Sequence, residues 1–168
     1  MKALRLGVGI VVALVVQTTL ARYLAGGRVV VDFVLVAVMY AALADGPLSG
    51  LWAGTVAGLV QDALGSGVIG IGGLSKTIVG FLAGIVGTQF IVAQSPSRFV
   101  VFFLGSLLHS ILFMGLYVLL GLRTFEWSPS GVLGQALATA VIGTLVFALG
   151  EFLPGAIERR RAGRGPRH

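Results

Sequence analysis

Long apolar stretches recur along this 168-residue chain and restrict what it can fold into. Six of them approach or reach the roughly 20 residues that a helix needs to cross a bilayer. They run over residues 6–24, 29–44, 48–64, 74–93, 99–122 and 132–153. Because hydrocarbon offers no partner for backbone N–H and C=O groups, such stretches form helices there. The sequence predicts an all-α integral membrane protein with six transmembrane helices.

The composition supports a membrane protein. Hydrophobic residues make up 57% of the chain and charged residues 11%, too little charge to cover a soluble domain of this size. The chain has no cysteine, which excludes disulfides and thiolate metal sites. The apolar run after Lys2 and Arg5 reaches Leu20 without a small-residue cleavage site, so we expect an uncleaved first span.

The basic residues predict the orientation of the chain. Six spans place both termini on one side of the membrane. If that side is the cytoplasm, eight basic residues face inward: Lys2, Arg5, Arg98, Arg159, Arg160, Arg161, Arg164 and Arg167. Four face outward: Arg22, Arg28, Lys76 and Arg123. This excess predicts that both termini are cytoplasmic.

We expect two parts, a transmembrane domain over residues 1–157 and a basic cytoplasmic tail over residues 158–168. The tail carries Arg159, Arg160, Arg161, Arg164 and Arg167. Beside a membrane span, such a cluster favours binding to anionic lipid headgroups. Nucleic-acid binding is not expected, because no recognition motif accompanies the charge.

The second and third segments are short, at 16 and 17 residues. At about 1.5 Å per residue they reach roughly 24 to 26 Å, against a hydrocarbon core of ~30 Å. They could span the membrane or form a re-entrant hairpin. We favour spanning, because Asp45, Gly46 and Pro47 have the composition of a solvated loop.

Glycines spaced four apart form a ridge that begins just before the third segment and continues along it: Gly46, Gly50, Gly54 and Gly58. Gly80 and Gly84 repeat the spacing in the fourth segment. In lipid, small residues let helix backbones approach closely. These faces could receive the transmembrane helix of a partner, or they could pack within the chain, on each other or on a third helix, and the sequence does not rank the two interpretations.

Several polar side chains fall within or beside the predicted spans, where an ionisable group favours a partner or a wet cavity. Asp62 and Lys76 lie at the same outer end, so we expect either an ion pair or two solvated side chains. Other candidates for an intramembrane polar site are Asp32, Gln61, His109 and Gln135. We interpret Gln17 as a hydrogen-bonding residue between helices, and His109 as a buried, hydrogen-bonded group.

No set of residues indicates catalysis. No histidine and carboxylate cluster has metal-ligand spacing. The glycines at 67–73 lack the strand-to-helix context of a phosphate loop. Ser75 and Lys76 are adjacent on a helix and do not face each other. We therefore expect no enzyme activity, no metal and no cofactor.

Residues 32–82 resemble the bacterial rod-shape-determining MreD family. An apolar segment opens with Asp32 and ends with Tyr40, and a glycine-spaced segment follows and runs into Gln61 and Asp62. A glycine-rich turn then leads into the stretch Leu-Ser-Lys-Thr-Ile-Val-Gly-Phe-Leu at 74–82. The chain departs from the family pattern at Val31, where proline is frequent, and at Phe81, where tyrosine is common.

The resemblance implies a multi-pass protein of the bacterial inner membrane that acts in cell elongation without catalytic activity. It implies binding to the bitopic protein MreC and, through MreC, to the MreB filament and the peptidoglycan synthases. A second copy of the chain is a further expected partner. The resemblance also implies helices arranged as in the S-components of energy-coupling-factor transporters, which gives the alternative function of a vitamin-type transporter subunit that binds a small molecule.

Overall fold

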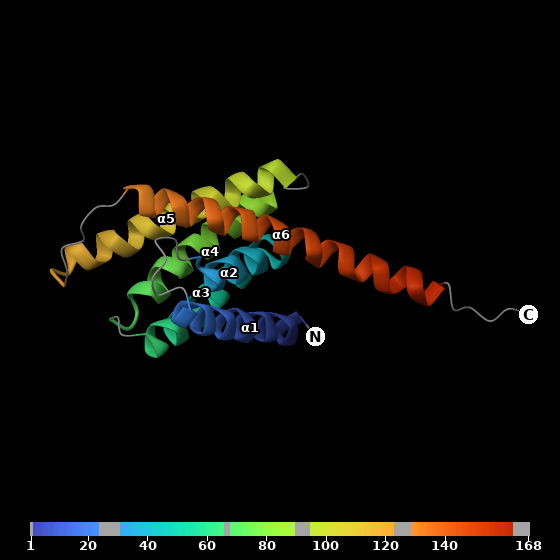
Figure 1. The fold of residues 1–168 in the computed structure, drawn as a ribbon, viewed down its shortest axis with the longest axis horizontal. Coiled ribbons are helices and arrows are strands. Elements are labelled where there is room, and N and C mark those ends of the chain that lie inside the picture. The colour runs from blue at the N-terminus through green and yellow to red at the C-terminus, as the bar shows by residue number, and fades with distance from the viewer. Residues whose placement is uncertain (1, 24–30, 66–67, 90–94, 123–128, 163–168) are drawn as a thin grey trace, which may run out of the picture.

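The computed structural model describes residues 2–23, 31–65, 68–89, 95–122 and 129–162, with side chains for 6–19, 31–65, 68–89, 96–122 and 129–150. These residues form six α-helices in a bundle (Figure 1). The helices are α1 Lys2–Tyr23, α2 Phe33–Asp45, α3 Pro47–Leu64, α4 Ile71–Gln89, α5 Ser95–Leu119 and α6 Pro129–Ala162. The all-helical class is confirmed, and the six helices follow the six predicted segments in order.

Three of the helices are long and apolar enough to cross a membrane. They are Ile71–Gln89, Pro96–Leu119 and Pro129–Gly150. Large apolar side chains also cover the outside of the bundle, among them Val12, Trp52, Leu104 and Leu145. An apolar exterior of this kind is the surface that a membrane covers. A membrane protein is therefore supported, while six complete spans and cytoplasmic termini stay predictions.

Helix α2 lies at the centre of the bundle. It packs against all five other helices. Most of its side chains are buried, including Leu35, Val38 and Ala42, and the face that carries Ala37 and Tyr40 is half-buried. A helix that is apolar all round belongs in a protein interior. At 13 residues α2 is only about 20 Å long. Its ends need not reach the bilayer surface, because protein rather than lipid surrounds it.

Helices α3 and α4 form the most extensive helix contact in the bundle. A Cβ atom built on Gly54 would lie 2.5 Å from the carbonyl oxygen of Lys76, and one built on Gly58 would lie 2.5 Å from the Cα atom of Gly73. Gly50 and Gly80 likewise meet backbone to backbone. The glycine ridge is thus an internal contact between two helices of this chain. The interpretation that it receives a partner helix is replaced by the alternative of internal packing.

The other two glycines of the predicted ridges, Gly46 and Gly84, lie at one end of the contact between α3 and α4. Gly46 links α2 directly to α3 and has a φ of 94°, a conformation that favours glycine. Its N–H group donates to the carbonyl oxygen of Ala42 and closes α2. Pro47 opens α3, where its missing N–H group costs nothing. A Cβ atom on Gly84 would collide with the backbone of Pro47.

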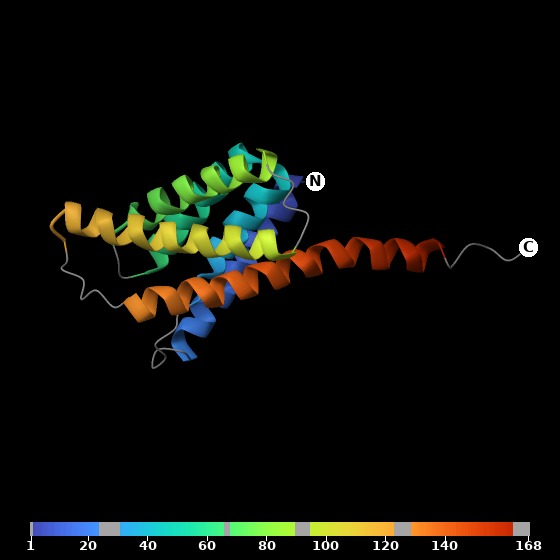
Figure 2. The same cartoon turned by 90° about the horizontal axis from the view of Figure 1, so that it is seen from above.

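Helices α5 and α6 lie side by side on one side of the bundle, and α6 extends past the other helices toward the C-terminus (Figure 2). The helix runs to Ala162 and includes the first residues of the predicted tail. The tail arginines Arg159, Arg160, Arg161, Arg164 and Arg167 lie outside the residues whose side chains are described.

Candidate functional site

A polar cavity of about 380 Å³ lies at one end of the bundle. Its principal polar residues lie in the half of the bundle away from the N-terminus of α1 and the C-terminus of α6, most of them near helix ends and His109 near the middle of α5. These residues are Gln17, Asp32, Gln61, Asp62, Lys76, His109 and Gln135. The cavity thus faces the opposite end of the bundle from both chain termini. With cytoplasmic termini, as the basic residues predict, this is the outer face.

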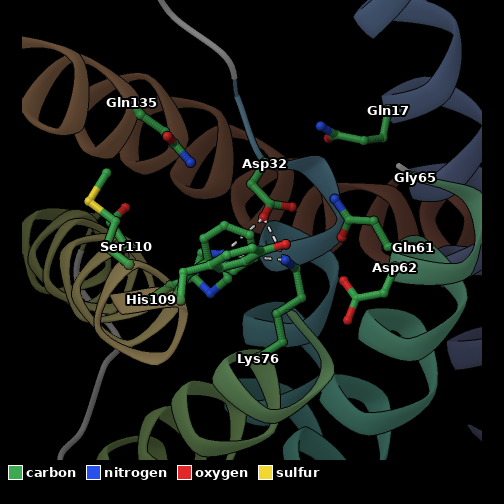
Figure 3. A pocket seen from close by; sticks show the side chains of 12 residues that line it. Gln17, Asp32, Gln61, Asp62, Gly65, Lys76, His109, Ser110 and Gln135 are labelled. Atoms are coloured by element: carbon green, nitrogen blue, oxygen red, sulfur yellow. Dashed lines mark hydrogen bonds and ion pairs between the residues drawn. The ribbon is translucent and has the colours of Figure 1, made fainter. Parts of the chain in front are cut away.

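Three side chains form a buried cluster in the wall of the cavity (Figure 3). The ammonium nitrogen of Lys76 lies 2.8 Å from Oδ2 of Asp32. Nε2 of His109 lies 3.4 Å from the same oxygen and 3.3 Å from the lysine nitrogen. The exposed fractions of Asp32, Lys76 and His109 are 5%, 3% and 5%. A carboxylate and an ammonium at such depth need one another, because each alone loses its hydration.

Asp32 has a second role as the N-terminal cap of α2. Its Oδ1 atom accepts a hydrogen bond of 2.9 Å from the N–H group of Leu35. Oε1 of Gln17 accepts from the N–H group of Phe33 at 2.8 Å. These two side chains satisfy amides that the first turn of a helix leaves without partners. The interpretation of Gln17 as an interhelical hydrogen-bonding residue is confirmed.

Asp62 caps a different helix. Its Oδ2 atom accepts hydrogen bonds from the N–H groups of Gly70 at 2.9 Å and Gly73 at 3.1 Å, at the start of α4. A carboxylate suits this position, because the N-terminus of a helix carries a partial positive charge. The expected ion pair between Asp62 and Lys76 is therefore wrong. Solvation of Lys76 is wrong as well, since this lysine is buried against Asp32.

Capping predicts how variants of Asp62 behave. Asp62→Ala should lower the free energy of unfolding by about 0.5 to 2 kcal/mol, the usual cost of losing a helix cap. Asp62→Asn keeps an acceptor oxygen for the two glycine amides and should lose less. Thermal unfolding in detergent measures both. An equal loss in the two variants would show that the negative charge, and not the cap, is what matters.

Two amide side chains of the cavity have polar atoms without partners among the described residues. Oε1 of Gln61 is buried and has no hydrogen-bond partner in the described part of the chain. Gln135 on α6 makes no hydrogen bond with the described residues and lines the same cavity. Nδ1 of His109 is also buried without a partner there. Groups of this kind are costly to bury unless water or a ligand satisfies them.

The cavity brings together all six polar residues that the sequence indicated, while the predicted glycines lie in the contact between α3 and α4 and at its ends. An aromatic side of the cavity was missed. Phe113 and Tyr117 form a tilted pair with ring centroids 4.9 Å apart, beside Met114. His109, Phe113 and Tyr117 are spaced four apart, so they share one face of α5. That spacing could have identified them.

The cluster does not form a metal site, since no group of three metal-ligating side chains occurs within the described residues. Both carboxylates of the cavity are engaged by the contacts described above. The arrangement is therefore a rigid polar site that can hold water or a small molecule.

A helical bundle with an apolar exterior, a glycine-packed interior and a buried charge cluster defines a polytopic membrane protein. The family model described as the rod shape-determining protein MreD matches residues 3–153. The chain belongs to the MreD family, and its role is in rod shape determination. Comparison with curated proteins and with solved structures gave no match. The similarity to S-components accordingly stays a prediction.

Proposed function

We propose that this protein is a non-catalytic scaffold of the cell-elongation machinery in the inner membrane, where it binds the bitopic protein MreC. Through MreC it connects lateral peptidoglycan synthesis to the MreB filament. The membership in the MreD family supports the general role. The observation that carries the proposed partner is an apolar groove between α1 and α6.

The groove has a volume of about 670 Å³. Helix α1 packs on α2 and α3, whereas α6 packs on α5 and α2, so a gap remains between α1 and α6 with α2 as its floor. Residues of all three helices line it, among them Gly9 and Ala13 of α1, Val36 and Ala37 of α2, and Val146 of α6.

The shape of the groove suits a single transmembrane helix. Its walls are mainly apolar, and Gly9, Ala13 and Ala37 place only small side chains on part of its surface. Helices in lipid associate through close packing of this kind. The hydrophobic effect does not drive their association, because their apolar surfaces are already out of water. The glycines of α3 and α4 are already in contact with one another and are not free for a partner. This groove is therefore the better candidate for the MreC helix.

Gly9→Leu tests this site. A Cβ atom at Gly9 meets no atom within 4 Å, so the larger side chain fills the groove and leaves the fold intact. We expect co-purification of MreC to fall about tenfold or more, since a clash of about 1.4 kcal/mol already gives a factor of ten.

Gly115→Leu is the matched control. Gly115 lies on α5, is exposed, and also has no atom within 4 Å of a built Cβ. The control should retain MreC at the level of the unmodified chain. Equal retention of MreC by both variants would contradict the proposed groove, and loss of a second copy of this chain in place of MreC would assign the groove to self-association.

The proposal includes two further expectations. The tail arginines at 159–167 bind anionic lipid at the cytoplasmic surface, where each basic residue contributes about 1 kcal/mol. The six helices span the membrane with both termini in the cytoplasm. Labelling of a cysteine introduced at Asp45 from the cytoplasmic side tests the second expectation, since a re-entrant hairpin would leave this position unlabelled.

A further inference from the structure

The polar cavity has no part in the proposed docking of a transmembrane helix, because it lies at the end of the bundle away from the termini and on other helix faces. Its volume of about 380 Å³ falls within the range of sites that hold small molecules. The identity of the ligand can be narrowed by the charges and free hydrogen-bonding groups of the wall.

An anionic ligand does not fit this wall. Among the described residues that line the cavity, Lys76 is the one lysine or arginine, and its ammonium is paired with Asp32 at 2.8 Å. An incoming phosphate or carboxylate would have to break that pair and would also meet the carboxylate of Asp62. Repulsion between two negative charges is strong in a site that is shielded from water.

A cationic ligand fits no better. Oδ1 of Asp32 accepts from the N–H group of Leu35, and its Oδ2 contacts Lys76 and His109. Oδ2 of Asp62 accepts from two amides at the N-terminus of α4. The charge of Asp32 is therefore compensated by Lys76, and that of Asp62 is stabilised by two amides at the partly positive N-terminus of α4.

The groups that remain available are neutral and polar. Gln61 and Gln135 each offer an amide, which can both donate and accept hydrogen bonds, and neither amide is fully satisfied by the described residues. They lie on opposite sides of the cavity, with the charge cluster between them (Figure 3).

The aromatic side completes the match to one class of ligand. Phe113 and Tyr117 line the cavity, and an aromatic ring carries a negative face that attracts the weakly positive C–H groups of a saturated ring. A sugar combines an apolar ring face with hydroxyl groups that both donate and accept hydrogen bonds. We propose that the cavity binds one uncharged sugar-type group through Gln61, Gln135 and the aromatic pair.

The test uses the full chain without partners, in phosphatidylcholine nanodiscs free of glycosidic detergent. Thermal unfolding is followed while N-acetylglucosamine or a diacylglycerol monoglucoside is added. We expect a saturable rise in Tm with at least one of these neutral probes. A response to the free sugar identifies a soluble ligand, and a response to the glycolipid alone identifies a lipid headgroup. Glucosamine and glucose 6-phosphate, which carry opposite charges, should give a dissociation constant at least tenfold weaker.

Two variants locate the site. Gln135→Leu and, independently, Gln61→Leu remove a cavity amide and should weaken binding of the responsive neutral probe at least tenfold. Gln89→Leu makes the same chemical change at an exposed position at the other end of α4 and should bind as the unmodified chain does. The proposal is overturned if neither neutral probe raises Tm, if the charged probes bind as well, or if the cavity variants respond as Gln89→Leu does. Because MreC is absent from the assay, a negative result leaves the scaffold proposal intact.

Discussion

Lys76→Met should cost about 3 to 5 kcal/mol of folding free energy, the penalty for removing one partner of a buried ion pair. Lys76 is 3% exposed, and its ammonium lies 2.8 Å from the carboxylate of Asp32. Methionine fills a similar volume, so the loss arises from the charge and not from packing. The variant leaves the Asp32 carboxylate buried without its ammonium, held by the N–H group of Leu35 and by His109.

The double variant separates the pair from its surroundings. Asp32→Asn alone leaves the ammonium unpaired, although asparagine keeps an oxygen for the N–H group of Leu35 and so preserves the cap on α2. We expect this single variant to be strongly destabilised as well. In the double variant no charge is left unpaired at this position, and replacing a whole buried pair by neutral groups is often nearly neutral. The double variant should therefore be more stable than either single one.

Unfolding by SDS in mixed micelles measures these differences as a double-mutant cycle. Additive losses in the cycle would mean that Asp32 and Lys76 act independently. That result would contradict the interpretation that the ion pair between Asp32 and Lys76 stabilises the wall of the cavity.

The helices could be predicted because they depend on local properties of the chain. Apolar length, the turn at Asp45, Gly46 and Pro47, and the other glycine or proline breaks give the six segments in order. The start of α2 was misplaced. Val29 was predicted as its first residue, but the helix begins at Phe33, because the side chain of Asp32 caps it there. An aspartate before an apolar run signals a cap, and here that signal was more informative than hydropathy.

The pairing of charges could not be derived, because it depends on how each helix is rotated about its axis. Asp62 and Lys76 lie at neighbouring helix ends, which made them the economical pair. In the structure Asp62 faces the first turn of α4, while Lys76 faces α2 and α5, where Asp32 and His109 lie. Asp32 is 44 positions away from Lys76 in the chain, as the numbering shows. Only the packing of α2 at the centre of the bundle brings the two together.

The spacing of Gly50, Gly54 and Gly58 correctly indicated close helix contact, and it left open whether the fourth segment, a third helix or a partner supplies the other side. Any helix with a small-residue face meets the same requirement in lipid. The matching glycines on α4 make the internal contact the better one, because two such ridges joined by a short connection are already neighbours. The face of α1 that lines the proposed docking groove carries one glycine, Gly9, with Ala13 four positions later, so a search for ridges of glycine alone does not find it.

Gly54→Ala should destabilise the protein by about 3 kcal/mol or more, at or above the upper end of the usual cost of overpacking. The added Cβ atom would lie 2.5 Å from the carbonyl oxygen of Lys76 and 2.7 Å from the backbone nitrogen of Thr77. Backbone atoms of a packed helix cannot rotate away as a side chain can, so α3 and α4 must separate. Gly54→Leu should leave no folded protein.

Gly115→Ala is the control, since a Cβ atom there meets no atom within 4 Å. In an open helical position alanine is favoured over glycine by about 0.5 to 1 kcal/mol, so this variant should be slightly more stable than the unmodified chain. The same substitution thus has opposite signs at the two positions, which unfolding in mixed micelles resolves. A Gly54→Ala protein that is as stable as the unmodified chain but no longer retains MreC would contradict this prediction. It would show that the glycine ridge binds the partner, and the MreC helix would then have no reason to lie between α1 and α6.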